Sequence, residues 1–113
     1  MSVNKVILVG NVGRDPQIRY VETQPVAEFS LATTERAYTS ASGAAIPERT
    51  EWHNIVMGGR AAETAERYIR KGTKLFIEGK LRTRTWTDRN ALKHSITEIL
   101  AENIEILSRS SQS

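Results

Sequence analysis

Residues 79–90 read GKLRTRTWTDRN, and the alternation in this stretch decides how the chain is interpreted. Three cations and an indole fall at every second position: Lys80, Arg82, Arg84 and Trp86. In an extended strand, side chains at this spacing share one face. The intervening threonines favour a strand, and TDRN is typical of a turn that ends one. The stretch therefore predicts a strand with a row of positive charge that ends in a flat aromatic ring.

The rest of the composition indicates one soluble domain. A chain of 113 residues suits a single domain, and 39% hydrophobic with 26% charged residues is ordinary for a globular protein. No segment approaches the ~20 apolar residues of a membrane span, and the first ten residues lack the features of a secretory signal. The chain has no cysteine, which excludes disulfides and thiolate metal sites and fits a cytoplasmic location.

The basic residues are concentrated in one part of the chain. Between Arg67 and Lys93 there are nine Lys or Arg and two acidic residues, so this segment carries 9 − 2 = +7, against a net charge of +3 for the whole protein. Such a local field attracts polyanions. For the charge alone, a solubilising surface is the alternative interpretation.

Hydrophobic patterns predict several strands around this segment. Residues 6–9 form a short apolar run and predict a strand buried on both faces. Residues 25–35 and 50–57 alternate as half-buried strands do. Residues 73–86 predict a long strand whose apolar face carries Leu75, Ile77 and Leu81. Between the second and third of these strands, residues 36–49 are mostly small and have no regular period, which predicts a long loop.

One helix is predicted at about residues 60–71, and one segment is ambiguous. Ala61, Ala65, Tyr68 and Ile69 form an apolar stripe at helical spacing. In residues 95–107 the apolar positions also fit a helix, and the pattern alone favours that interpretation. As a strand, this segment would have to change phase near Asn103, which needs a β-bulge.

No catalytic or metal-binding pattern is present in the sequence. His53 and His94 lack the spacing of a metal site, and the carboxylates are too scattered for acid–base catalysis. The glycines before the helix lack the Gly-Lys-Ser/Thr of a phosphate loop. We therefore expect no enzyme activity, no metal and no cofactor. His53 lies on its strand beside Ile55 and Met57, which favours a packed or interface histidine.

The two tryptophans favour binding of a nucleic acid. Trp86 shares a face with three cations, and Trp52 lies on the strand face opposite Ile55 and Met57. An open indole stacks on a nucleobase with ~1–3 kcal/mol, nearly regardless of sequence, and neighbouring cations meet the phosphates. The alternatives are packing roles, with Trp86 capping a hydrophobic edge and Trp52 in the core.

Several sequence blocks, in order, resemble a known family. VNKVILVGNVGRDPQIRY, EFSLATTER, TEWHNIV, YIRKGTKLFIEGKLRTRTW and ITEI are similar to bacterial single-stranded DNA-binding proteins, from Val3 to about Leu107. The resemblance implies an all-β OB-fold: a five-stranded Greek-key barrel with one helix between the third and fourth strands. It also implies that residues 96–107 are the last strand, against the helical pattern. We expect this domain to span residues 1–107, followed by a short polar tail at 108–113.

The resemblance implies a non-catalytic protein that coats single-stranded DNA during replication, recombination and repair, as a homo-oligomer, which in this family is usually a tetramer. The residues that would contact DNA are Trp52, Trp86, Lys80, Arg82, Arg84, Arg60, Lys71 and Tyr38. The first strand, with Val6 and Leu8, and His53 would lie in subunit contacts. The segments 36–49 and 87–93 would form arms that reach over the DNA.

The sequence departs from the family pattern at two places. The family usually has an aromatic residue near Gly58, and it commonly ends in an acidic tip that recruits partner enzymes, whereas this sequence ends in SRSSQS. We therefore expect a short version without that acidic tail, and recruitment through such a tip is not carried over. Two rivals remain: a primosome-type OB-fold adaptor with weak DNA affinity, and a nuclease on the same barrel.

Overall fold

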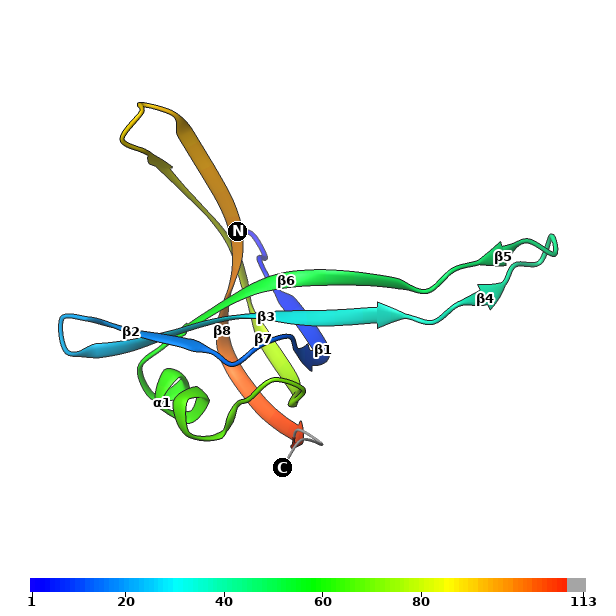
Figure 1. The fold of residues 1–113 in the computed structure, drawn as a ribbon, viewed down its shortest axis with the longest axis horizontal. Coiled ribbons are helices and arrows are strands. Elements are labelled where there is room, and N and C mark those ends of the chain that lie inside the picture. Colours follow the sequence, from blue (N-terminus) through cyan, green and yellow to red (C-terminus); the bar gives the residue numbers. More distant parts are fainter. Residues whose placement is uncertain (110–113) are drawn as a thin grey trace.

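The computed structural model describes residues 1–109, which are mainly β-strands (Figure 1). The strands are β1 (Val6–Val12), β2 (Gln17–Val21), β3 (Gln24–Glu35), β4 (Tyr38–Thr39), β5 (Ala45–Ile46), β6 (Arg49–Gly58), β7 (Lys74–Thr87) and β8 (Lys93–Ser108). One helix, α1 (Gly59–Tyr68), lies between β6 and β7. Within the described range, no helix is both long and apolar enough to cross a membrane.

Five long strands close into a barrel. The sheet runs in the order β1-β7-β8-β6-β3, and β3 pairs back onto β1, where Asn11 lies opposite Ala32 and Val12 opposite Leu31. The short strand β2 pairs with the first half of β3. Counted along the five long strands, α1 falls between the third and the fourth. The predicted barrel with one helix is therefore confirmed, with β2 as an additional strand.

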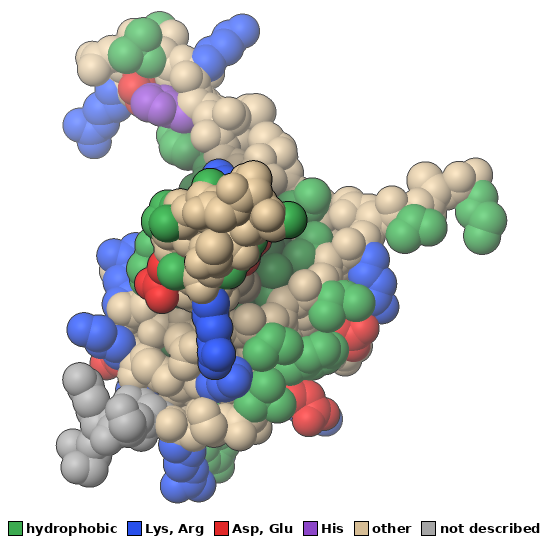
Figure 2. Space-filling model, turned by 90° about the vertical axis from the view of Figure 1, so that its right-hand side faces the viewer, with side chains coloured by type: hydrophobic (Ala, Val, Ile, Leu, Met, Phe, Trp, Pro, Cys, Tyr) green, Lys and Arg blue, Asp and Glu red, His purple; other side chains and the backbone are tan. Residues whose placement is uncertain are grey.

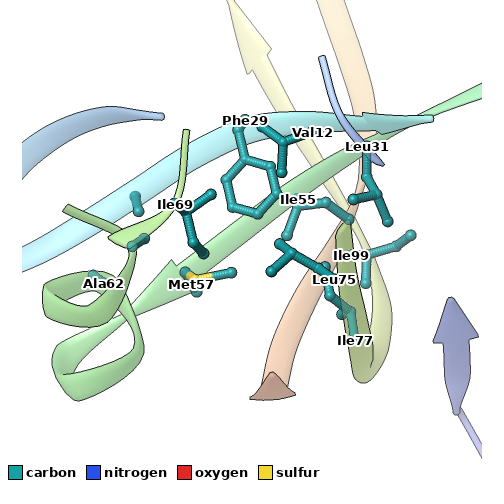
Figure 3. Close-up of a cluster of buried hydrophobic side chains, with 12 residues drawn as sticks. Val12, Phe29, Leu31, Ile55, Met57, Ala62, Ile69, Leu75, Ile77 and Ile99 are labelled. Atoms are coloured by element: carbon teal, nitrogen blue, oxygen red, sulfur yellow. The ribbon is translucent and has the colours of Figure 1, made fainter. Parts of the chain in front are cut away.

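The core lies inside the barrel and under α1 (Figure 3). The alternation predicted for β3 and β6 places Leu31, Ile55 and Met57 in this core. Leu75 and Ile77 of β7 join them from the other side of the barrel. Burying side chains of this size contributes roughly 1.5–3 kcal/mol each. The inward faces thus close the barrel and leave the outward faces of the same strands free to carry the site.

Two arms project from the barrel (Figure 1). One is the hairpin formed by the far halves of β7 and β8, in which no residue from 80 to 87 is buried. Leu81, predicted on the apolar face, is half exposed because it lies beyond the barrel. The other arm extends β3 and β6 into the small β4–β5 hairpin. The segment 36–49 is therefore not wholly a loop, because its small residues pair across a turn without showing an apolar period.

Residues 96–107 form a strand, as the family resemblance implied, and the helical interpretation is wrong. β8 pairs with β7 along nearly its whole length. Glu78 lies opposite Asn103 and Gly79 opposite Ala101, so Glu102 is an extra residue in the ladder. This bulge falls where the strand interpretation required one. It shifts the alternation by one residue, and the apolar positions before and after it together mimic helical spacing.

Three further expectations need correction. The apolar run of β1 is not buried on both faces, because Ile7 and Val9 point outward and are 59% and 47% exposed. The helix ends at Tyr68, and its buried positions are Ala62 and Ala65, while the Tyr68 ring is exposed. Of the predicted tail at 108–113, Ser108 is the last residue of β8, and residues 110–113 lie outside the described range.

Candidate nucleic-acid interface

Trp52 lies on the outward face of β6, over the barrel. Its neighbours along the strand alternate, so Ile55 and Met57 are buried while the indole is 59% exposed. Gly13 provides the space for the ring: a Cβ atom at this position would lie 2.4 Å from Cζ3 of Trp52 and 3.1 Å from Oγ of Ser30. The position of the Trp52 indole therefore requires a residue without a side chain at position 13, which Gly13 provides.

Trp86 lies on the β7–β8 arm and is 44% exposed. The guanidinium carbon of Arg84 lies 5.6 Å from the centre of its ring. The His94 ring, directly opposite on β8, stacks on the indole with 5.3 Å between ring centres and 18° between planes. The predicted shared face of Arg84 and Trp86 is thus confirmed. A cation over an exposed indole contributes ~0.5–1 kcal/mol, and a stacked aromatic pair a similar amount.

Arg84 is held by a buried carboxylate. Its Nε and Nη2 donate hydrogen bonds to Oε1 and Oε2 of Glu98, at 2.7 and 3.0 Å. Glu98 is only 5% exposed. The hydrogen bond from Arg84 is the main cause that lowers the pKa of the Glu98 carboxyl, against the opposing effect of burial. Glu98 therefore stays ionised and fixes the guanidinium at two of its three nitrogens.

The turn of the arm holds His94 in a similar way. Asp88 Oδ2 lies 2.6 Å from Nε2 of His94. Asp88 Oδ1 accepts hydrogen bonds from the backbone N–H groups of Asn90 and Leu92, which closes the turn. The contact with His94, followed by the bond from Leu92, lowers the pKa of Asp88. The turn, the histidine and the tryptophan therefore form one connected unit.

A polar cleft of about 170 Å³ lies on the outer face of the barrel. It is lined on one side by Gln17 of β2 and Ser30 of β3, and on the other by the Arg84–Glu98 pair. The cleft is lined by Arg14, Gln17, Glu28, Phe29, Ser30, Asn54, Ile55, Val56, Arg84, Ile96 and Glu98. Figure 2 shows Lys and Arg side chains at the end of the β7–β8 arm and scattered over the body of the molecule. The outward faces of the strands thus carry two exposed indoles, a polar cleft and basic groups.

The other predicted contact residues are exposed but lie in separate places. Lys80 and Arg82 lie on the arm, on the Arg84 face of β7. Arg60 is in the first turn of α1, and Lys71 lies in the turn after the helix, where its backbone N–H donates to Asp15 Oδ1 at 2.8 Å. Tyr38 is at the start of the other arm. Of the predicted basic residues, only Arg84 lines the cleft.

The predicted subunit contacts lie at partly buried positions of β1 and β6. Val6 and Leu8 are partly buried and pack against the core, while the outward face of β1 carries Ile7 and Val9. The His53 ring is partly buried, and its Nε2 lies 2.8 Å from Oγ1 of Thr33 on β3. An interface along β1 would therefore use Ile7 and Val9, with Val6 and Leu8 supporting the strand from below.

Sequence reasoning missed Glu98, His94 and the cleft residues Arg14 and Asn54. A usable signal existed for His94, because it and Trp86 are equally distant from Asn90, the centre of the turn. The same turn centre places Glu98 opposite Arg82, but no local signal marked its diagonal contact with Arg84. Within residues 1–109 there is also no group of three or more His, Asp or Glu side chains that could hold a metal ion.

Three comparisons with known proteins indicate the same family. The model of the single-strand binding protein family matches residues 3–107. The single-stranded DNA-binding protein of Bacteroides thetaiotaomicron is 57% identical over 109 residues, which are 96% of this chain and 68% of that protein. A solved structure described as Plasmodium falciparum SSB complex with ssDNA is similar, with a TM-score of 0.85 and 32% identity. That match covers 96% of this chain and 97% of the other.

Proposed function

This chain belongs to the single-strand binding protein family, and we propose that it binds single-stranded DNA without sequence preference. In this role it coats exposed strands during replication, recombination and repair. Because the family is one of binding proteins, the chain is not an enzyme. The resemblance is to bacterial proteins, so the proposed location is the cytoplasm, where bacterial DNA lies.

The observation that carries the proposal is the pair of exposed indoles on a basic outer face. Trp52 over the barrel and Trp86 on the arm each present a ring to which a base can stack, worth ~1–3 kcal/mol per base. Lys80 and Arg82 on the arm supply charge for phosphates. Stacking is tolerant of base identity, which fits binding without sequence preference. The structural neighbour whose description includes ssDNA supports this proposal, and nothing favours an adaptor or a nuclease.

The remaining predicted contacts belong to the same proposal. We assign Arg60 and Lys71 to the DNA path next to the helix, and Tyr38 to the second arm, because all three side chains are exposed. The cleft residues Arg14 and Asn54 join them, since they line the same cleft as Arg84 and Glu98.

Replacing each tryptophan tests the proposed function. Trp52→Ala and Trp86→Ala should each weaken binding of an oligo-dT strand by ~1–3 kcal/mol, and intrinsic fluorescence of the wild type should be quenched on binding. For the wild type, log K should fall with log salt by ~0.7 per phosphate contact. Fluorescence titrations at several salt concentrations measure the affinities, the quench and the salt dependence. A wild type with no quench, whose affinity survives both substitutions, would contradict stacking.

We also propose that the protein is a homo-oligomer, in line with the family a tetramer, and that β1 contributes to the contact. Ile7 and Val9 form an exposed apolar face, and in the described ladder residues 6–10 of β1 pair only with β7. Apolar faces and unpaired strand edges both favour self-association. Ile7→Glu should shift the sedimenting species towards the monomer, while the matched change Val21→Glu, on the exposed β2, should not. An unchanged mass for Ile7→Glu would exclude this face.

A further inference from the structure

Glu98 is a buried acidic residue on a face otherwise suited to bind a polyanion. In the ladder it lies directly opposite Arg82, yet its carboxylate reaches diagonally to Arg84 and accepts from two of its nitrogens. Within residues 1–109, neither Lys80 nor Arg82 forms an ion pair, although both lie on the same face of β7. One of the three cations in the row is thus already neutralised, and this requires an explanation.

The charge balance makes Arg84 a poor ligand for phosphate. The Arg84–Glu98 pair has no net charge, so it releases few counterions on binding DNA. A phosphate that paired with Arg84 in place of Glu98 would leave the buried Glu98 carboxylate without its partner. An unpaired buried charge is costly in free energy. The guanidinium instead lies over the Trp86 ring, 5.6 Å from its centre. The geometry therefore relates Arg84 to the indole rather than to the phosphates.

We propose that Glu98 is a positioning residue for DNA binding: by fixing Arg84 at Nε and Nη2, it holds the guanidinium against Trp86 and so orients the indole for stacking. Glu98 itself does not touch the DNA. On this basis the three cations of the row divide into two roles. Lys80 and Arg82 serve the backbone, and Arg84 serves the tryptophan. The inference rests on the proposed function, since it assigns a role within that same site.

The opposite reading makes a different prediction for the same substitution. If Glu98 only masked a phosphate ligand, Glu98→Gln would release Arg84, and DNA would bind more tightly with a steeper salt dependence. If Glu98 positions Arg84, Glu98→Gln loosens the guanidinium and the indole, and DNA binds more weakly even though the substitution removes a negative charge. The two roles therefore differ in the sign of the effect.

The test uses oligo-dT titrations with Trp86 as the only tryptophan, in a Trp52→Phe background. We expect Glu98→Gln to lose two- to five-fold in affinity, the equivalent of ~0.5–1 kcal/mol, and to show a smaller quench. Arg84→Lys, which keeps the charge but not the two-nitrogen contact, should behave in the same way. Glu105→Gln is the matched control: it removes one charge from an exposed position of β8 and should leave the quench unchanged.

Each outcome decides something. Weaker binding of both variants supports the proposal. Equal or tighter binding by Glu98→Gln, or an Arg84→Lys variant that binds as the background does, overturns it. Thermal melting shows whether Glu98→Gln still folds, and if it does not, Arg84→Lys decides alone. If neither the wild type nor the Trp52→Phe background protein binds oligo-dT, the proposed function itself is refuted.

Discussion

Trp52 and Trp86 expose similar fractions of their side chains, yet the two rings are held in different ways. Trp52 lies on β6, where the strand crosses the closed barrel opposite Ala32 of β3. The contact that limits its ring is a glycine, Gly13. Trp86 lies on an arm with no core below it, and its ring contacts the side chains of Arg84 and His94. One ring is positioned by the backbone frame, and the other by the side chains of Arg84 and His94.

This difference indicates what can disturb each ring. The frame under Trp52 is built from strands whose inward faces are buried, so a change in charge or pH should affect it little. The contacts of Trp86 depend on the ionised carboxylates of Glu98 and Asp88. A change in volume should therefore act on Trp52, and a change in charge on Trp86.

The largest effect is expected from adding a methyl group beneath Trp52. In Gly13→Ala, the new Cβ would lie 2.4 Å from Cζ3 of the indole, so the ring must move. Because the clash is with the far end of a side chain, the fold should survive while the stacking geometry does not. We expect oligo-dT affinity to fall by ~1 kcal/mol or more, with the full stacking contribution of ~1–3 kcal/mol as the ceiling. Fluorescence titration and thermal melting measure the two effects separately.

Gly58→Ala is the control for this substitution, since only the Pro25 carbonyl oxygen lies near the new Cβ, at 3.9 Å. Combining Gly13→Ala with Glu98→Gln sharpens the comparison further. If the two rings are held independently, the losses in binding free energy should add. A Gly13→Ala protein that melts and binds as the wild type does would show that the place of Trp52 over Gly13 has no importance for binding.

The same contrast explains what could be predicted from the sequence. The face shared by Arg84 and Trp86 was predictable, because alternation in a strand is a local property of consecutive residues. The pairing of Arg84 with Glu98 was not, because Glu98 lies opposite Arg82 in the ladder and reaches Arg84 diagonally. The bulge at Glu102 comes later in β8. That bulge also made β8 look helical. Contacts across a ladder are set by tertiary structure, and the local pattern contains little information about them.

β1 shows a second limit of the sequence. Val6, Ile7, Leu8 and Val9 are all apolar, so the pattern contains no alternation from which to separate the two faces. Burial on both faces was the natural prediction for such a run. In the structure only one face packs on the core, and Ile7 and Val9 remain exposed. An apolar run alone cannot distinguish a strand inside one chain from a strand that is covered by another chain.

The smallest effect is expected from acid, and it should reach Trp86 first. The pKa of Glu98 is lowered in the folded protein, chiefly by its hydrogen bond with Arg84. A lowered carboxyl pKa means that the unfolded chain binds the proton more readily than the folded one. The stabilisation is therefore fully present above the ordinary glutamate pKa of about 4.3 and is lost as pH falls through the lower, folded value. Between pH 7 and 5 this pair should not change.

Two single-tryptophan proteins, Trp52→Phe and Trp86→Phe, allow the two rings to be followed separately from pH 7 to 3. The emission of Trp86 should change below the ordinary glutamate pKa, and before global unfolding, while that of Trp52 changes only when the barrel unfolds. Adding Glu98→Gln to the Trp86 reporter should reduce its early change, and what remains would report Asp88, whose pKa is lowered as well. If both rings respond together, or if Glu98→Gln leaves the Trp86 transition in place, the arm does not depend on this carboxylate, and the contrast between the two tryptophans fails at that point.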